Sequence, residues 1–171
     1  MWDGIVSAAA SESRLWADAL LPAERQQRAP VFSPLAPDRH RLGLETIYEG
    51  YLAHYGRPRL FAPDGDETAL LLGDHLYAQG LVRIAQSGDV AAVADLAELI
   101  SLCAQGRAEA REGDGAAWAA TAALLGTVGL GGARDELRLR GDARALEAVA
   151  REAAGDDAVD AALAAHARLV G

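Results

Sequence analysis

Residues 45–58 read ETIYEGYLAHYGRP, and this stretch carries two acidic side chains one helical turn apart. On a helix, Glu45 and Glu49 lie on the same face, where like charges repel one another and weaken the helix by roughly 0.2–0.5 kcal/mol. Either both carboxylates point into water, or a positive group lies between them. Gly56 and Pro58 then end the helix, since both residue types are typical of helix C-termini.

The composition around this stretch predicts an all-α protein. The chain has 171 residues, a length that suits one domain, and we expect a single helical domain over residues 1–171. Hydrophobic residues make up 51% of the chain and aromatic residues only 5%. Alanine and leucine supply most of the apolar content and favour helix, whereas the β-branched residues typical of strands are scarce.

The charge balance excludes several classes of function. The net charge is −9, and all 16 basic residues are arginines. An acidic chain without a basic stripe is a poor nucleic-acid binder, and a chain without lysine cannot form a Schiff base through that residue. No segment reaches the about 18 apolar residues of a membrane span, and the N-terminus carries no positive leader. We therefore expect a cytoplasmic protein with no transmembrane segment.

Hydrophobic periodicity and helix-breaking residues divide the chain into helices. The first is amphipathic over 3–26, with its apolar face formed by Trp2, Val6, Ala9, Trp16 and Leu20. Asp38 and Asp66 are placed to cap the next two helices. The expected helices after the first cover residues 38–55, 66–86, 89–111, 115–128, 142–154 and 156–170.

The cysteine and histidine residues predict no metal cluster. Cys103 is the only cysteine, which excludes an internal disulfide, and its apolar surroundings predict an inert core thiol. The four histidines show no metal-ligand spacing.

Between about residues 37 and 87, the order of the motifs resembles that of the trans-isoprenyl diphosphate synthases, the polyprenyl synthetase family. Glu45 and Glu49 stand at the first and third acidic positions of that family's Asp-Asp-x-x-Asp motif, and the GRP that follows matches its Gly-x-Pro. The stretch LLLGDHLYAQGL, with Gly73 and Asp74, is similar to the family's Gly-Asp-x-Leu helix in kind and in spacing. The similarity continues more weakly to about residue 128.

The resemblance implies a helical bundle like a truncated isoprenoid-synthase fold. In that family the acidic motif holds Mg²⁺, which bridges a substrate diphosphate, so Glu45 and Glu49 would be the metal positions. His54 and Tyr55 stand where the family has two arginines. Together with Arg57 and Asp74, they occupy the positions expected to contact substrate.

Three departures from the family pattern all remove affinity for metal and diphosphate. Thr46 stands at the second acidic position, between two glutamates that are longer than the family's aspartates. His54 and Tyr55 replace the paired arginines, and Asp114 stands where the family has a later diphosphate-binding lysine. We therefore expect no cofactor, or Mg²⁺ bound only weakly at a vestigial site.

A second acidic cluster lies near the C-terminus, where GDDAVD contains Asp156, Asp157 and Asp160. These residues open the last expected helix, so we expect an N-cap followed by first-turn acids that favour the helix dipole. The alternative is a metal site that faces Glu45 and Glu49 across a helical cavity.

Three functions follow from these patterns. The first is a catalytically degenerate isoprenoid-synthase-like protein that binds an isoprenoid or another hydrophobic ligand, or that serves as the partner subunit of a complete prenyltransferase. The second is an active Mg²⁺-dependent prenyltransferase or terpene-synthase-like enzyme with an atypical acidic site. The third is an unrelated all-α interaction domain.

The expected helices over 89–111 and 115–128 are apolar nearly all round, which indicates that all their sides are buried. The resemblance points the same way, because this region forms a dimer interface in the family. We therefore expect a homodimer, or a heterodimer with a full-length prenyltransferase. In such a dimer, Glu45 and Glu49 would remain as a solvated pair.

Overall fold

The computed structural model describes residues 1–127 and 129–170. Over these residues the chain forms nine α-helices and no β-strand, which confirms the all-α prediction. The helices are α1 (Trp2–Glu12), α2 (Arg14–Asp18), α3 (Arg41–Tyr55), α4 (Asp66–Ala85), α5 (Val90–Ala108), α6 (Asp114–Ala123), α7 (Gly131–Arg140), α8 (Arg144–Ala154) and α9 (Asp156–Val170). Short 3-10 turns at Ala23–Arg25, Ser33–Leu35 and Asp38–His40 interrupt the segment between α2 and α3.

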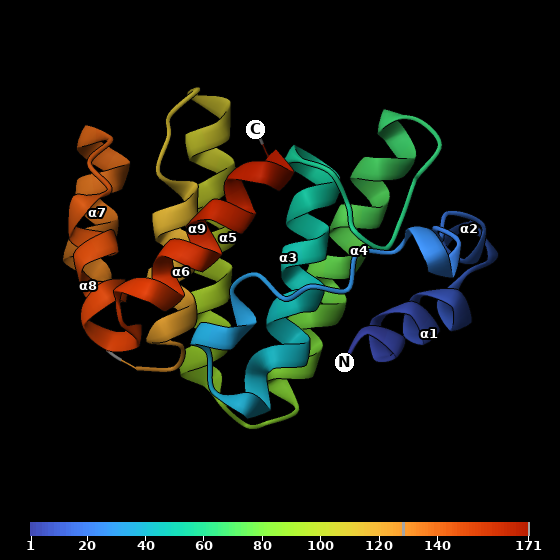
Figure 1. Ribbon diagram of the computed structural model, residues 1–171, viewed down its shortest axis with the longest axis horizontal. Helices are drawn as coiled ribbons and strands as arrows, with labels where there is room; N and C mark the ends of the chain where they lie inside the picture. The colour runs from blue at the N-terminus through green and yellow to red at the C-terminus, as the bar shows by residue number, and fades with distance from the viewer. Residues whose placement is uncertain (128, 171) are drawn as a thin grey trace.

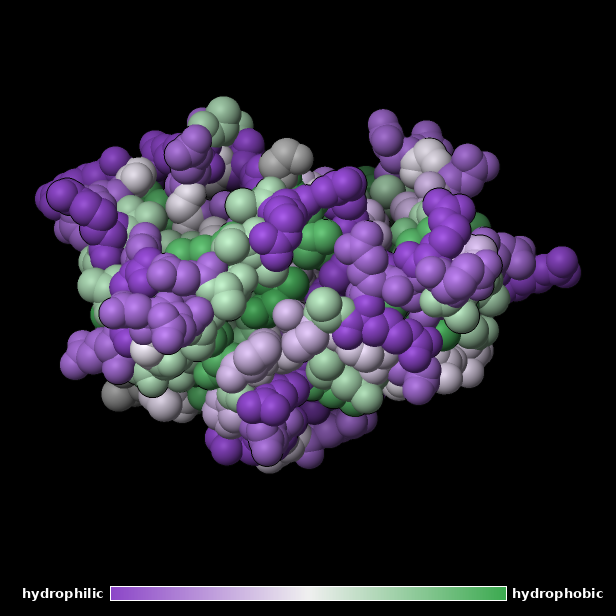
Figure 2. All heavy atoms as spheres, in the orientation of Figure 1, coloured by the Kyte–Doolittle hydropathy of each residue, from purple (hydrophilic) through white to green (hydrophobic). Residues whose placement is uncertain are grey.

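The helices form a bundle that is elongated in one direction. Helices α3 and α4 pair in its middle, the short α1 and α2 lie at one end, and α7 and α8 lie at the other (Figure 1). Hydrophilic side chains dominate both ends of the face shown in Figure 2, whereas hydrophobic atoms are visible along its middle. Within the described part of the chain, no helix is both long enough and apolar enough to cross a membrane.

The first predicted helix is wrong, because the chain leaves helical geometry at Ser13. This residue is extended, with φ −154° and ψ 142°, and its hydroxyl accepts the N–H of Leu15 at 3.0 Å, which caps α2. The predicted caps Asp38 and Asp66 accept no capping bond from the helices that they precede or begin. Asp89 is a genuine cap, because its carboxylate accepts the N–H of Ala92 at 3.0 Å at the start of α5.

Helix α6 lies inside the bundle and explains the apolar sequence around Trp118. Every residue from 115 to 122 is buried, and α6 packs against α5, α8 and α9. The apolar circumference of α6 is therefore covered by the chain itself, so this helix gives no reason to expect a second chain. The predicted helix over 115–128 ends early at Ala123, and its last expected residue, Val128, lies outside the described residues.

Helices α3 and α4 approach each other closely through two pairs of glycines. A Cβ added at Gly80 would lie 2.8 Å from the carbonyl oxygen of Gly43, and one added at Gly50 would lie 2.8 Å from that of Gly73. On each helix the two glycines are seven residues apart, so both fall on the face that meets the other helix. The two backbones approach closely at these glycines, and the side chains of Ile47, His54 and Ile84 pack directly against them from the facing helix.

Replacing Gly80 by alanine is expected to lower the free energy of unfolding by about 1–3 kcal/mol, because the added methyl group forces the two helices apart. Urea denaturation followed by circular dichroism measures the change. Gly106→Ala on α5 is the matched control. Its Cβ would approach only the Arg111 carbonyl oxygen, at 3.9 Å, so helix propensity should stabilise this variant by up to about 1 kcal/mol. Equal effects of the two substitutions would contradict the close approach.

Candidate functional site

Glu45 and Glu49 are both buried on the inner side of α3, and a positive group lies between them. Each has 0% exposure, and Arg59, which follows α3 in the next loop, is 2% exposed. Its guanidinium Nη2 lies 2.8 Å from Oε2 of Glu45, and its Nε lies 3.0 Å from Oε2 of Glu49. The prediction of a solvated acidic pair is therefore wrong. Glu45, Glu49 and Arg59 form a buried ionic cluster.

Backbone N–H groups complete this ionic cluster. Oε1 of Glu45 accepts the N–H groups of Val31 and Ser33 at 3.0 and 3.2 Å. Oε1 of Glu49 accepts the N–H groups of Arg59 and Leu60, both at 2.7 Å. Each glutamate therefore holds one loop against α3. A buried charge is strongly destabilising unless it is paired and hydrogen-bonded. Both glutamates are paired with Arg59 and hydrogen-bonded through Oε1, whereas the contact between Glu45 Oε2 and Arg59 Nη2 is an ion pair without hydrogen-bond geometry.

Two aromatic rings flank the guanidinium. The Cζ of Arg59 lies 4.9 Å from the ring centroid of Trp2 and 5.0 Å from that of Tyr48. Burial disfavours a charged Arg59, but the Glu45 and Glu49 carboxylates outweigh it and raise the pKa of Arg59. Burial also raises the pKa of Glu49, although Arg59 and the surrounding N–H groups oppose this. The arginine thus remains charged and enclosed.

The residues at the predicted metal position do not fit Mg²⁺. This ion takes about six oxygen ligands in octahedral geometry, and here the glutamate oxygens are engaged by Arg59 and by backbone N–H groups. The hydroxyl of Thr46 donates to the Leu42 carbonyl at 2.7 Å. Among the residues that the structure describes, no group of three or more His, Cys, Asp or Glu side chains could hold a metal ion.

The second acidic cluster lies on the surface at the start of α9. Arg151 binds Oδ1 of Asp156 at 3.3 Å and Oδ1 of Asp160 at 2.7 Å, while Asp157 is exposed. Asp156 is the first residue of α9, and no hydrogen bond joins its side chain to the described backbone, so the predicted cap is replaced by an ion pair. The structure does not bring these three aspartates together with the glutamates of α3.

The positions predicted to contact substrate fall into two places. His54 and Asp74 meet where α3 packs on α4, with His54 Nε2 3.3 Å from Asp74 Oδ1, and the Tyr55 ring lies 5.5 Å from the His54 ring. Arg57 contacts the C-terminal end of α9 instead, where its N–H donates to the Leu169 carbonyl at 2.9 Å. The four residues therefore form no common site.

A partly buried polar network that the sequence did not predict lies beside the ionic cluster. Asp114, at the start of α6, accepts hydrogen bonds from the Tyr51 hydroxyl and from Arg107. His166 of α9 lies 3.5 Å from Asp114 through Nε2 and 2.9 Å from the Tyr48 hydroxyl through Nδ1. Burial opposes ionisation of Asp114, but its hydrogen bonds and the Arg107 charge outweigh burial and hold its pKa well below the usual value.

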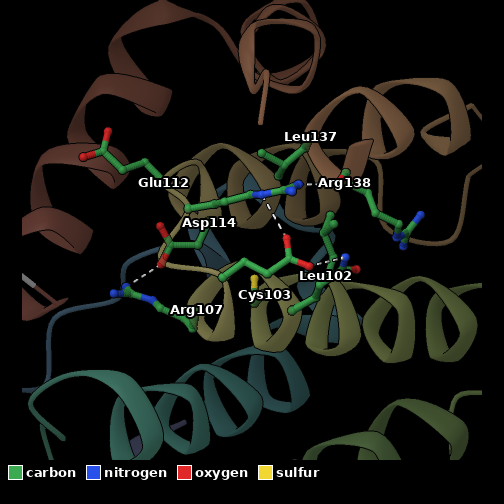
Figure 3. A pocket seen from close by; sticks show the side chains of 11 residues that line it. Leu102, Cys103, Arg107, Glu112, Asp114, Leu137 and Arg138 are labelled. Atoms are coloured by element: carbon green, nitrogen blue, oxygen red, sulfur yellow. Dashed lines mark hydrogen bonds and ion pairs between the residues drawn. The ribbon is translucent and has the colours of Figure 1, made fainter. Parts of the chain in front are cut away.

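A small cavity adjoins this network between α5, α6 and α7. Arg107 and Asp114 lie on one side of it, and Leu137 and Arg138 of α7 lie on the other (Figure 3). Its volume is about 20 Å³, which is enough for a water molecule but not for an organic ligand. Cys103 lies at its edge, buried as predicted, and burial raises the pKa of its thiol.

Two histidines, the buried His40 and the partly buried His54, should make stability depend on pH. Burial lowers the pKa values of His40 and His54, although neighbouring aspartates oppose this. Below about pH 6.5 these two histidines become protonated in the unfolded chain, whereas in the folded chain they stay neutral to a lower pH. The free energy of unfolding should be highest above that pH and should fall as the pH drops towards 5.

Urea denaturation at pH 7.5 and pH 5.5 measures this loss, and the double variant His40→Gln/His54→Gln should reduce the difference between the two values. The low pKa values of Asp89 and Asp114 affect stability only below about pH 4, outside this window. An unchanged difference in the double variant would contradict the assignment.

Comparison with protein-family models, with curated proteins and with solved structures gave no match to this chain.

Proposed function

We propose that this chain is a catalytically degenerate, isoprenoid-synthase-like protein that acts as the non-catalytic subunit of a helical complex. The observation that carries the proposal is the buried ionic cluster of Glu45, Glu49 and Arg59. In the family that the sequence resembles, the acidic motif needs a metal cation that it shares with substrate. Here a guanidinium supplied by the chain satisfies both carboxylates at 2.8 and 3.0 Å.

Two residues of the site also support the loss of metal and diphosphate binding. Arg59 is enclosed by Trp2 and Tyr48, so it is not available to a diphosphate. Asp114, at the position of the family's lysine, is bound by Arg107. Both groups stabilise the fold, and neither is free to bind an anionic substrate.

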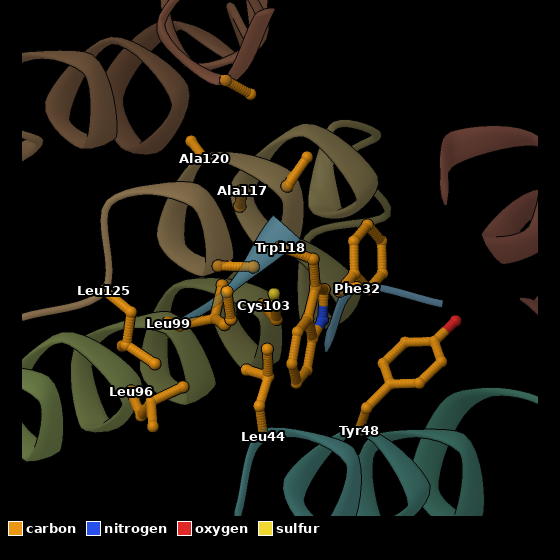
Figure 4. Packing of buried hydrophobic residues seen from close by; sticks show 14 of the residues in the cluster. Phe32, Leu44, Tyr48, Leu96, Leu99, Cys103, Ala117, Trp118, Ala120 and Leu125 are labelled. Atoms are coloured by element: carbon orange, nitrogen blue, oxygen red, sulfur yellow. The ribbon is translucent and has the colours of Figure 1, made fainter. Parts of the chain in front are cut away.

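The aromatic interior favours a subunit over a carrier of a hydrophobic chain. Trp118 lies 5.7 Å from Phe32, 5.0 Å from Tyr48 and 5.5 Å from Tyr51, measured between ring centroids. Figure 4 shows Trp118 and Phe32 side by side above Tyr48, with Leu44 and Cys103 filling the space next to them. These side chains occupy the space between α3 and α6 in which an isoprenoid would have to lie.

The outer face of α5 supports assembly with a second helical protein. Its outward positions alternate at spacings of four and three residues and carry no charge: Val90, Ala94, Ala97, Ser101, Ala104 and Ala108. Val90 is 79% exposed, and on the neighbouring α4, Leu71 and Val82 are 55% and 57% exposed. An uncharged stripe of period 3.5 is typical of a helix that packs along another helix, and small residues allow close approach.

Sedimentation of the protein alone, and mixed with a complete prenyltransferase of the same organism, tests the proposal. We expect a complex with a second copy or with the enzyme, and we expect Ala97→Glu on α5 to abolish it. Ala148→Glu on the exposed face of α8 is the control and should leave the complex intact. A monomer under all conditions, or release of diphosphate from an allylic diphosphate by this chain with Mg²⁺, would overturn the proposal.

A further inference from the structure

We propose that a groove beside the C-terminal end of α9 binds an organic anion that carries a hydrocarbon chain. The groove has a volume of about 240 Å³ and lies between α9, the loop after α3 and the segment before α3. Arg57, Arg59 and Arg168 provide its charged lining, and Val31, Ala165 and Leu169 provide most of its apolar wall. This site is independent of the partner-subunit proposal and lies outside the acidic motif.

The charge of the groove is opposite to that of the protein. The chain has a net charge of −9, yet among residues 1–127 and 129–170 no carboxylate side chain lines this groove. Arg59 is paired with two buried glutamates, and the three groups together carry a formal charge of −1, so the positive charge at the groove comes from Arg57 and Arg168. Over residues 1–127 and 129–170, neither of these two exposed arginines forms an ion pair. Two unneutralised guanidinium groups from different segments therefore converge at one groove.

Arg57 has a structural role that leaves donors free. Its backbone N–H donates to the Leu169 carbonyl at 2.9 Å, and one guanidinium N–H donates to the Arg168 carbonyl. These bonds satisfy carbonyls at the end of α9 and offset the negative end of its dipole. A guanidinium carries five N–H donors, so the remaining donors of Arg57 and those of Arg168 can bind an anionic head group, as arginine pairs do with phosphate and carboxylate.

The apolar wall accounts for the hydrocarbon part of the ligand. Val31 is 4% exposed and is held in place because its N–H is bound by Glu45. In Figure 2, hydrophobic atoms are visible in the middle of the face, near α9 and the segment that crosses in front of α3. An inorganic anion would leave this wall unused, whereas an alkyl chain would cover it. The ionic cluster fixes both loops of the groove, so the site is preformed.

Isothermal titration calorimetry with n-decyl phosphate, below its micelle concentration, tests the proposal. We expect one saturable site per chain, weaker binding of decanol and of inorganic phosphate, and about tenfold or greater weakening in Arg168→Ala. Arg168 is exposed and its side chain holds no described contact, so this variant should fold normally. Arg14→Ala on α2, an exposed arginine that does not line the groove, is the matched control and should bind like the wild type.

Comparing the four ligands separates the contribution of the anionic head group from that of the hydrocarbon chain. Binding of decanoate as well as decyl phosphate would support a site for any anionic head group, and binding of decyl phosphate alone would support a phosphate site. Decanol or inorganic phosphate bound as tightly as decyl phosphate would overturn the proposal, because the head group or the chain would then contribute nothing. Undiminished binding by Arg168→Ala, or no binding at millimolar concentration, would also overturn it.

Discussion

Replacing Arg59 by alanine is expected to lower the free energy of unfolding by about 3–5 kcal/mol, because two carboxylates would remain buried without their counter-charge. Glu45 and Glu49 are fully buried, and their backbone N–H partners cannot neutralise them. The two loops that these glutamates hold should also loosen. Guanidinium chloride denaturation followed by circular dichroism measures the loss of stability, and hydrogen exchange of Val31 and Leu60 reports on the loops.

Arg14→Ala is the control for this substitution. Arg14 pairs with Asp18 at 3.5 Å, but its side chain is 93% exposed, and exposed pairs contribute at most about 1 kcal/mol. The two arginines therefore differ in burial while both contact carboxylates. If Arg59→Ala cost no more than Arg14→Ala, the glutamates would have to be solvated or protonated, and the ionic cluster would not hold the fold together.

Replacing Trp118 by alanine is expected to cost about 3–5 kcal/mol, because it empties the largest fully buried side-chain volume at the centre of α6. The indole contacts Phe32, Tyr48 and Tyr51, so the cavity would be bordered by rigid rings that cannot easily collapse into it. Thermal and chemical denaturation measure the effect. Binding of a small apolar probe such as benzene to the variant alone would report the cavity directly.

Two further variants calibrate this prediction. Trp118→Phe keeps an aromatic ring and loses no hydrogen bond, since the indole N–H has no described partner, so it should cost clearly less than alanine. Leu139→Ala removes a side chain that is 75% exposed and should change stability by less than about 0.5 kcal/mol. A cost for Trp118→Ala as small as that for Leu139→Ala would place α6 at the surface.

Local patterns in the sequence determined the helical class and most helix positions. Helix propensity, a 3.6-residue apolar period, and glycine or proline breaks act over a few residues. They can therefore be recognised in the sequence without knowledge of the tertiary structure. They located α3, α4, α5, α8 and α9 closely. They failed at Ser13, whose cap splits a continuous apolar pattern, and they missed α7, whose glycine-rich start resembles a loop.

Only the tertiary structure decided what the acidic pair does. The sequence reduced the choice to water or a positive group, but Arg59 reaches Glu45 from fourteen residues away, across a turn whose geometry no periodicity encodes. The same holds for Tyr48 and His166, which meet although 118 positions separate them. The apolar circumference of α6 predicted burial, but which elements cover this helix depends on how the other helices pack around it. Spacing along a helix fixes which residues share a face, whereas the partner of that face is set by long-range packing.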